Sequence, residues 1–156
     1  MRILIVSDSH GNPQNVEKAI NMLNPDHLIF LGDGEREIEN LSYIYDKIVF
    51  HMIRGNCDIM SNSPASDIEI IGGYKFFITH GHVFSVKTNT NNLIAVARQR
   101  NAKFVLYGHT HIPKNTYLDG MYIINPGSCS CPVVGKPSCA YIDIVGDDIL
   151  TNIVML

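Results

Sequence analysis

Seven side chains that can bind a divalent cation or move a proton each follow a short apolar segment of this chain. They comprise two carboxylates, four imidazoles and one amide: Asp8, His10, Asp33, Asn56, His80, His109 and His111. Imidazoles combined with carboxylates suit Mn²⁺, Fe²⁺, Zn²⁺, Co²⁺ or Ni²⁺, whereas sites built from carboxylate or carbonyl oxygens alone suit Mg²⁺ or Ca²⁺. The residue types therefore predict a transition-metal site.

The number of donors indicates two ions rather than one. Seven donors exceed the needs of a single ion that keeps an open position, and they fit two ions that share a carboxylate. Two ions ~3.5–4 Å apart clamp a phosphoryl group for in-line displacement. They also lower the pKa of a bridging water, so that a hydroxide nucleophile forms near neutral pH. The chemistry we expect is hydrolysis of a phosphoric ester.

A sheet must bring these side chains together, because they are spread over a hundred positions. Apolar and β-branched runs predict strands at 2–6, 27–31, 48–53, 67–71, 74–79, 103–107, 114–118, 121–124, 138–145 and 149–154. Helical periodicity predicts helices at 13–23, 35–46 and 89–100. The first third of the chain therefore predicts parallel βαβ crossovers, and the rest predicts mainly hairpins. In such α/β proteins, ligands bind at the carboxyl edge of the sheet.

Length and composition limit the class of protein. The 156 residues are 46% hydrophobic and 17% charged, which fits one globular α/β domain spanning residues 1–156. A net charge of −3 without a Lys/Arg cluster does not favour a nucleic-acid or anionic membrane surface. No apolar run approaches the ~20 residues of a membrane span, and Met1 leads straight into the first strand without a signal peptide. We therefore expect a cytoplasmic protein with reduced thiols.

Five short motifs occur in a characteristic order: D-S-H, G-D-G, G-N-C-D, T-H-G-H and G-H-T-H. Together they resemble the calcineurin-like metallophosphoesterase family, and within it the short YfcE-type phosphodiesterases. The resemblance extends over nearly the whole chain. It implies a four-layer α-β-β-α sandwich of two mixed sheets, with the metals at the carboxyl edge of the sheets.

The resemblance also implies a role for each of the seven side chains. Asp8, His10 and His111 would hold the first metal, Asn56, His80 and His109 the second, and Asp33 would bridge them. Asn56 would also help to hold the phosphoryl oxygens of a small phosphodiester. Mn²⁺ is the expected cation, with Ni²⁺, Fe²⁺, Zn²⁺ and Mg²⁺ as alternatives. Residues 125–128 resemble a family turn near the site, where Gly127 would meet a backbone requirement.

One position departs from most of the family. Cys57 stands where most relatives have a histidine that protonates the leaving oxygen, although YfcE-type members share the cysteine. A thiol with a pKa of about 8.5 is a weak substitute for an imidazolium. Cys57, the second catalytic candidate beside Asn56, therefore predicts a preference for good leaving groups, or a proton from water or His82. Asp58 is expected to cap its loop.

Several alternatives remain open at this point. The retromer subunit of this fold is a scaffold for protein contacts, but here every ligand position carries a competent residue. A phosphomonoesterase or a nuclease would differ only in substrate. Zinc at Cys129, Cys131 and Cys139 is a further alternative, although their spacing is not that of a zinc finger. We expect His27 and His51 to be structural and the glutamates of 35–39 to be solvated. The oligomeric state stays open, a homo-oligomer included.

Overall fold

The computed structural model describes residues 1–156 and contains two five-stranded sheets. The first has the order β10-β9-β1-β2-β3 and the second the order β4-β5-β6-β8-β7. The strands are β1 (Arg2–Val6), β2 (His27–Phe30), β3 (Val49–Met52), β4 (Ser66–Ile71), β5 (Tyr74–Thr79), β6 (Phe104–Tyr107), β7 (Lys114–Leu118), β8 (Met121–Asn125), β9 (Ser138–Val145) and β10 (Asp148–Met155). The helices are α1 (Gln14–Leu23), α2 (Glu35–Ile44), α3 (Asn91–Gln99) and the short 3₁₀ helix η1 (His82–Phe84).

Both sheets are mixed, as predicted. β1, β2 and β3 run parallel, while β9 and β10 extend that sheet in antiparallel fashion. In the second sheet β5, β6 and β8 run parallel between the antiparallel edge strands β4 and β7. The parallel strands β1, β2, β5 and β6 lie at the centre of the molecule. The polar turns that follow them therefore gather at the carboxyl edges of the two sheets.

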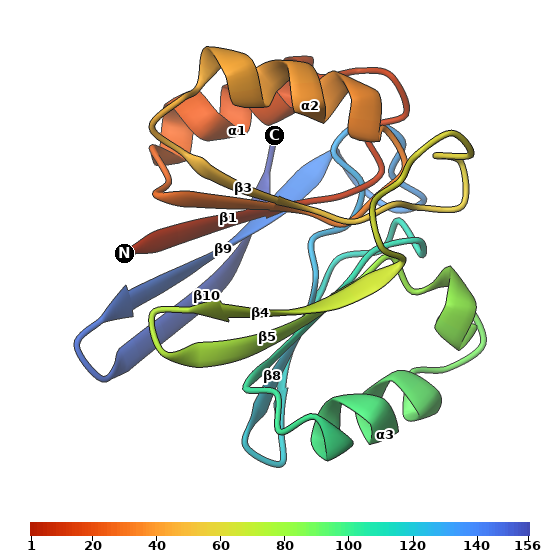
Figure 1. The fold of residues 1–156 in the computed structure, drawn as a ribbon, viewed down its shortest axis with the longest axis vertical. Coiled ribbons are helices and arrows are strands. Elements are labelled where there is room, and N and C mark those ends of the chain that lie inside the picture. Colours follow the sequence, from red (N-terminus) through yellow and green to blue (C-terminus); the bar gives the residue numbers. More distant parts are fainter.

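Alternating side chains of the central strands build the layers. Ile3 and Ile5 of β1 pack into the core between the two sheets, whereas Leu4 and Val6 pack into the core beneath α1 and α2. A third core lies between the other sheet and α3, around Leu93. Figure 1 shows α1 and α2 above one sheet and α3 below the other. The four-layer α-β-β-α sandwich is thus confirmed.

The predicted helices are present, but they are slightly shorter than expected. The helix predicted at 35–46 ends at Ile44, and the one predicted at 89–100 spans Asn91–Gln99. The helix predicted from residue 13 begins at Gln14, whose N–H donates to Asn12 Oδ1. Sequence reasoning missed η1, which is a single turn after Gly81. None of the helices has the length and apolar character needed to cross a bilayer.

Two histidines outside the predicted site pack against each other. His27 on β2 and His51 on β3 are neighbours, with 3.1 Å between His27 Nδ1 and His51 Nε2. His51 Nδ1 also lies 3.3 Å from Glu69 Oε2 on β4. The pair therefore links the two sheets at their β3–β4 edge, in agreement with the structural role predicted for both residues.

We expect acidification to weaken the fold through His27. Burial, together with the neighbouring His51, lowers the pKa of His27 below its usual value of about 6.5. The folded state therefore binds fewer protons than the unfolded state, and stability is lost as the pH falls through the window just below that value. Urea unfolding at about pH 7.5 and about pH 5.5 measures the loss. The loss should be smaller in His27→Gln, and an equal loss in both proteins would contradict the expectation.

Candidate metal centre

The backbone at the predicted ligands has an unusual conformation. Five of the seven predicted site residues have positive φ angles: Asp8 (57°), His10 (44°), Asp33 (63°), His109 (65°) and His111 (56°). Residues other than glycine adopt this left-handed region in only a few per cent of cases, although Asp and His do so more often than most. The five lie in the turns after β1, β2 and β6, and such conformations often cluster at functional sites.

His80 stands at the centre of the side-chain arrangement. Its Nε2 lies 3.1 Å from Asn56 Oδ1 and 3.1 Å from His109 Nδ1. The same atom lies 3.4 Å from Asp33 Oδ2 and 3.9 Å from Asp8 Oδ1. Side chains from the turns after β1, β2, β3, β5 and β6 therefore meet at one point.

The remaining two predicted ligands lie on the other side of Asp8. His111 Nε2 is 3.1 Å from Asp8 Oδ1 and 3.4 Å from His10 Nε2. The structure thus brings all seven predicted side chains together. Asp8, His10 and His111 form one group of donors within 4.8 Å of one another, and Asp8, Asp33 and His80 form another.

Backbone carbonyls orient two of the imidazoles. His80 Nδ1 lies 2.7 Å from the carbonyl oxygen of Leu31, and His111 Nδ1 lies 2.6 Å from that of Cys131. A carbonyl oxygen only accepts hydrogen bonds, so each Nδ1 carries a hydrogen, and in the neutral ring Nε2 is then the nitrogen with the lone pair. Both Nε2 atoms face the centre of the site, in the arrangement of metal-binding histidines that are held by a neighbouring acceptor.

Asp8 provides the test of whether a cation fits. Its carboxylate is fully buried; Oδ2 accepts hydrogen bonds from Ser7 Oγ (2.6 Å) and from the N–H of His109 (3.1 Å). Its other oxygen, Oδ1, is buried without any hydrogen-bond partner. An unpaired buried carboxylate oxygen is costly. A divalent cation between Oδ1 and the surrounding imidazoles would satisfy it, and the donor set fits such a cation.

Protonation states at the site are compatible with cation binding. Burial would raise the pKa of Asp33, but hydrogen bonds from His80 and from the N–H of Cys57 hold it well below its usual range. Burial and the neighbouring His80 lower the pKa of His109 to about 4. Burial lowers the pKa of His80 as well, yet Asp33 and Asp8 raise it on balance. An ionised Asp33 and a neutral His109 are the forms that coordinate metals, whereas His80 must lose the proton that its raised pKa favours when it binds a cation.

A segment remote in sequence holds the Asp8 turn in place. Ser128 Oγ donates to the carbonyl oxygen of Asp8 (2.8 Å) and accepts from the N–H of Cys131 (2.7 Å). The same segment supplies the carbonyl group that orients His111. Gly127 has a φ of 79°, and a Cβ there would overlap Ser138 Oγ, so it meets the predicted backbone requirement. Sequence reasoning gave Ser128 little weight, because an orienting serine has no signature of its own.

Asp58 connects two of the site turns, as its predicted capping role requires. Its carboxylate accepts hydrogen bonds from four backbone N–H groups, those of Asp33 (2.7 Å), Gly34 (2.8 Å), Glu35 (3.0 Å) and Gly55 (2.8 Å). Burial would raise the pKa of Asp58, but these N–H groups lower it on balance. The carboxylate thus caps the N-terminus of α2 and fixes the Asp33 turn to the loop that carries Asn56.

The two predicted proton sources differ in exposure. Cys57 is exposed, its Sγ accepts a hydrogen bond from Asn56 Nδ2 (3.3 Å), and partial burial and Asp33 raise the pKa of its thiol. Burial and His80 lower the pKa of His82, whose Nδ1 is buried without a partner. At neutral pH, therefore, Cys57 keeps its proton, whereas His82 is neutral and is not a ready acid.

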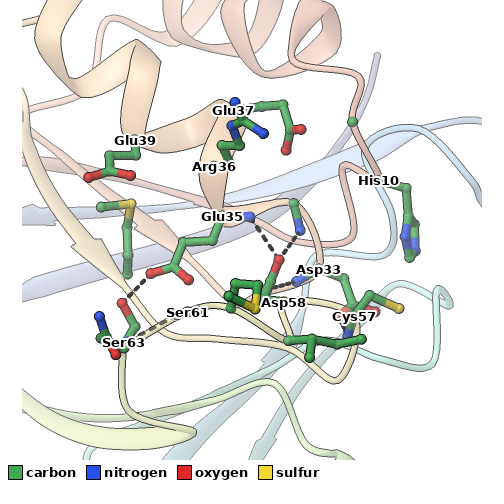
Figure 2. Close-up of a pocket in the computed structure, with 16 residues that line it drawn as sticks. His10, Asp33, Glu35, Arg36, Glu37, Glu39, Cys57, Asp58, Ser61 and Ser63 are labelled. Atoms are coloured by element: carbon green, nitrogen blue, oxygen red, sulfur yellow. Dashed lines mark hydrogen bonds between the residues drawn. The ribbon is translucent and has the colours of Figure 1, made fainter.

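A pocket of about 1050 Å³ borders the site between α2 and residues 57–63. Figure 2 shows His10, Asp33 and Cys57 at one end and Glu35 beside Ser63 at the other. The prediction of three solvated glutamates needs correction at Glu35, which is partly buried and accepts a hydrogen bond from Ser63 Oγ. Glu37 and Glu39 also line the pocket.

The cysteine alternative finds no support in the structure. Cys129 and Cys139 are buried in the core beneath α1 and α2, and burial raises the pKa of Cys139 to about 12. Cys131 is exposed. None of the three belongs to a group of donors close enough to hold an ion.

Comparison with known proteins identifies the family. Residues 1–147 match the model of the calcineurin-like phosphoesterase superfamily domain, so the chain belongs to that family. A predicted phosphoesterase from Streptococcus pneumoniae TIGR4, known as a crystal structure, superposes with a TM-score of 0.83 at 27% identity, over 99% of this chain and 88% of that one. The resemblance deduced from the five motifs is thereby confirmed.

Two named relatives show the breadth of the family. The phosphodiesterase YfcE of Escherichia coli K12 is 26% identical, in an alignment that covers 99% of this chain and 92% of the relative. Vacuolar protein sorting-associated protein 29 of Schizosaccharomyces pombe is 27% identical, over 92% of this chain and 78% of the relative. The chain is therefore similar both to a named phosphodiesterase and to a sorting protein.

Proposed function

We propose that this protein is a phosphodiesterase that uses two divalent cations to hydrolyse small phosphodiesters. The observation that carries the proposal is the buried, unpartnered Asp8 Oδ1, around which the predicted imidazoles converge. A protonated His111, 3.1 Å away, would pair with this oxygen in part, whereas a cation would satisfy it while the surrounding imidazoles stay neutral. Family membership and the similarity to YfcE support the same reaction class.

We keep the ligand assignment that the family resemblance implies. Asp8, His10 and His111, which form one group of donors, would hold one cation. Asn56 Oδ1 and His109 Nδ1 each lie 3.1 Å from His80 Nε2 and would hold the other cation with it, and Asp33 would bridge the two. When bound, two such cations would draw charge from the phosphoryl oxygens and acidify water, so that a nucleophile forms near neutral pH. We keep Mn²⁺ as the proposed cation, because a set rich in imidazole and carboxylate accommodates it.

The chain's own groups would position the substrate and handle the proton. The one hydrogen bond that Asn56 Nδ2 makes is to the exposed Cys57 Sγ, so this N–H₂ group could also donate to a phosphoryl oxygen. The Cys57 thiol holds a proton at the rim, but it is a weaker acid than an imidazolium. The neighbouring pocket offers room for one alcohol substituent of the diester. We therefore propose a preference for small diesters with good leaving groups.

The test is hydrolysis of bis-p-nitrophenyl phosphate by protein loaded with Mn²⁺. We expect chelation to lower the rate by at least about 100-fold, because the cations supply most of the charge stabilisation, and we expect added Mn²⁺ to restore it. Asp8→Asn should remain folded and be inactive with Mn²⁺. A rate that is unchanged after chelation would overturn the proposal. A panel of monoesters, diesters and cyclic nucleotides with Mn²⁺, Ni²⁺, Mg²⁺ and Zn²⁺ would then define the substrate.

The alternative is a protein-binding scaffold, which the similarity to the S. pombe sorting protein favours. Metal analysis separates the two functions. A scaffold purified in the presence of Mn²⁺ would retain almost no metal, whereas the enzyme should retain close to two ions per chain.

A further inference from the structure

A third group of potential metal ligands overlaps the two already described. Cys57 Sγ, a ring nitrogen of His10 and a carboxylate oxygen of Asp33 all lie within 4.8 Å of one another. Figure 2 shows the three side chains at the same end of the pocket. The donor atoms of this group are therefore as close together as those of the two groups described above.

The backbone keeps Cys57 close to the other two donors. Its N–H donates to Asp33 Oδ1 over 2.8 Å, and four N–H groups bound to Asp58 fix the loop that carries it. The Cys57 side chain itself is exposed, and its sulfur accepts a hydrogen bond only from the Asn56 side-chain amide. The sulfur can therefore turn toward a cation without any movement of the loop.

A sulfur donor changes which cation the site prefers. Thiolates are soft ligands that favour Zn²⁺ and similar ions, whereas Mn²⁺ and Mg²⁺ favour oxygen. Thiolate, imidazole and carboxylate are also the three types of ligand that bind Zn²⁺ in proteins. The combination of Cys57, His10 and Asp33 is therefore a set of donors for a thiophilic divalent cation.

We propose that Cys57, His10 and Asp33 form a capture site for a thiophilic divalent cation such as Zn²⁺. On binding, a bond forms between Sγ and the cation, and the thiol proton passes to solvent. Because the capture site takes His10 and Asp33 from the ligand sets proposed for hydrolysis, an ion held there displaces the catalytic arrangement. That consequence rests on the proposed function, whereas the capture of the ion does not.

The other cysteines provide a contrast within the same chain. Cys131 is also exposed, but it belongs to no group of metal donors. Cys129 and Cys139 are buried in the core. Cys131→Ser is therefore the matched control for Cys57→Ser, because each removes one exposed thiol and the serine preserves the Cys131 carbonyl that orients His111.

Co²⁺ serves as a spectroscopic stand-in for Zn²⁺. We expect Co²⁺ to produce a thiolate-to-cobalt charge-transfer band in the near ultraviolet in wild-type protein and in Cys131→Ser, and no such band in Cys57→Ser. Zn²⁺ should abolish the band by displacing Co²⁺. A band of equal intensity in Cys57→Ser, or no band in wild-type protein, would overturn the proposal.

Thiol reactivity gives a second measurement that needs neither substrate nor turnover. An aromatic disulfide reagent should react with two thiols of the native protein, Cys57 and Cys131. Zn²⁺ should slow the reaction of the Cys57 thiol by about tenfold or more, because a coordinated sulfur is a poor nucleophile. Mn²⁺ should leave both rates nearly unchanged, and equal protection by Mn²⁺ would show steric shielding and contradict the proposal.

Activity separates failure of this inference from failure of the proposed function. Wild-type protein with Mn²⁺ should lose activity when Zn²⁺ is added, and Cys57→Ser should lose less of its own activity. If the Mn²⁺ form hydrolyses nothing, the proposed function fails while the cobalt band still tests the capture site. If hydrolysis is observed but the band is absent, only the capture site is wrong.

Discussion

Replacing Asp58 with alanine should lower the free energy of unfolding by about 2–4 kcal/mol and kcat/KM by about 10- to 100-fold. The carboxylate accepts four N–H groups, and alanine would leave them without their acceptor. Loss of a helix cap alone costs about 1 kcal/mol. The remainder comes from release of the loop after β3 from the turn that carries Asp33.

Two further variants separate the loss of the cap from the loss of charge. Asp58→Asn retains one acceptor oxygen but turns an N–H₂ group toward N–H donors, so its effect should be intermediate. Asp46→Ala removes an exposed carboxylate beyond the other end of α2 and should leave stability and activity nearly unchanged. Urea unfolding and initial rates with Mn²⁺ measure the two effects. If Asp58→Ala resembled Asp46→Ala, the linking role of Asp58 would be disproved.

The layers were predicted from the family that the five motifs resemble, and the strand ends at Asp8 and Asp33 from the residue pattern itself. Short apolar runs that lead to Asp8 and Asp33 predicted neighbouring parallel strands with a shared edge, and the structure brings His80 to them from the other sheet. The positions of these strand ends are predictable because a strand can pair in few registers and because parallel βαβ crossovers are almost always right-handed. Neither argument depends on what surrounds the strand ends.

What the sequence did not reveal lies mainly in the backbone and in distant contacts. The carbonyl groups of Leu31 and Cys131 orient two imidazoles, yet every residue carries a carbonyl, so no residue type marks them. Ser128 reaches Asp8 across 120 positions of the chain, a distance at which no periodic pattern operates. Glu35 looked like a solvated helix residue because only the fold places Ser63 beside it.

The backbone conformation of the site turns also depends on contacts between segments that are distant in the sequence. The left-handed φ angles of Asp8, His10 and Asp33 are uncommon for non-glycine residues, although Asp and His adopt them more readily than most. The surrounding hydrogen bonds impose them, among them the bonds from the N–H of Asp8 to the carbonyl of Gly32 and from the N–H of His10 to the carbonyl of Asp33. Local propensities fail where function sets the conformation, and those places coincide with the candidate site.

Gly108→Ala should lower activity by about 100-fold, because a small displacement of catalytic groups is enough for such a loss. A Cβ at this position would overlap Ser7 Oγ and lie 3.0 Å from Asp8 Oδ2. The backbone of Gly108 is held on both sides, since its N–H donates to the carbonyl oxygen of His80 (3.1 Å) and its own carbonyl oxygen accepts from Asn125 Nδ2 (2.9 Å). The added methyl group must therefore displace Ser7 Oγ, which donates to Asp8 Oδ2, and so disturb the Asp8 carboxylate.

The expected cost to folding is smaller, about 1–3 kcal/mol, as is usual for one extra carbon in a packed region. Gly120→Ala is the matched control, because a Cβ there meets nothing within 4 Å although its φ of 81° strains the turn. Gly120→Ala should lose some stability and keep full activity, whereas Gly108→Ala should lose activity even under conditions in which it is fully folded. Retained activity and retained metal in folded Gly108→Ala would show that the position of Asp8 tolerates displacement, and a cation pair held through Asp8 would then be untenable.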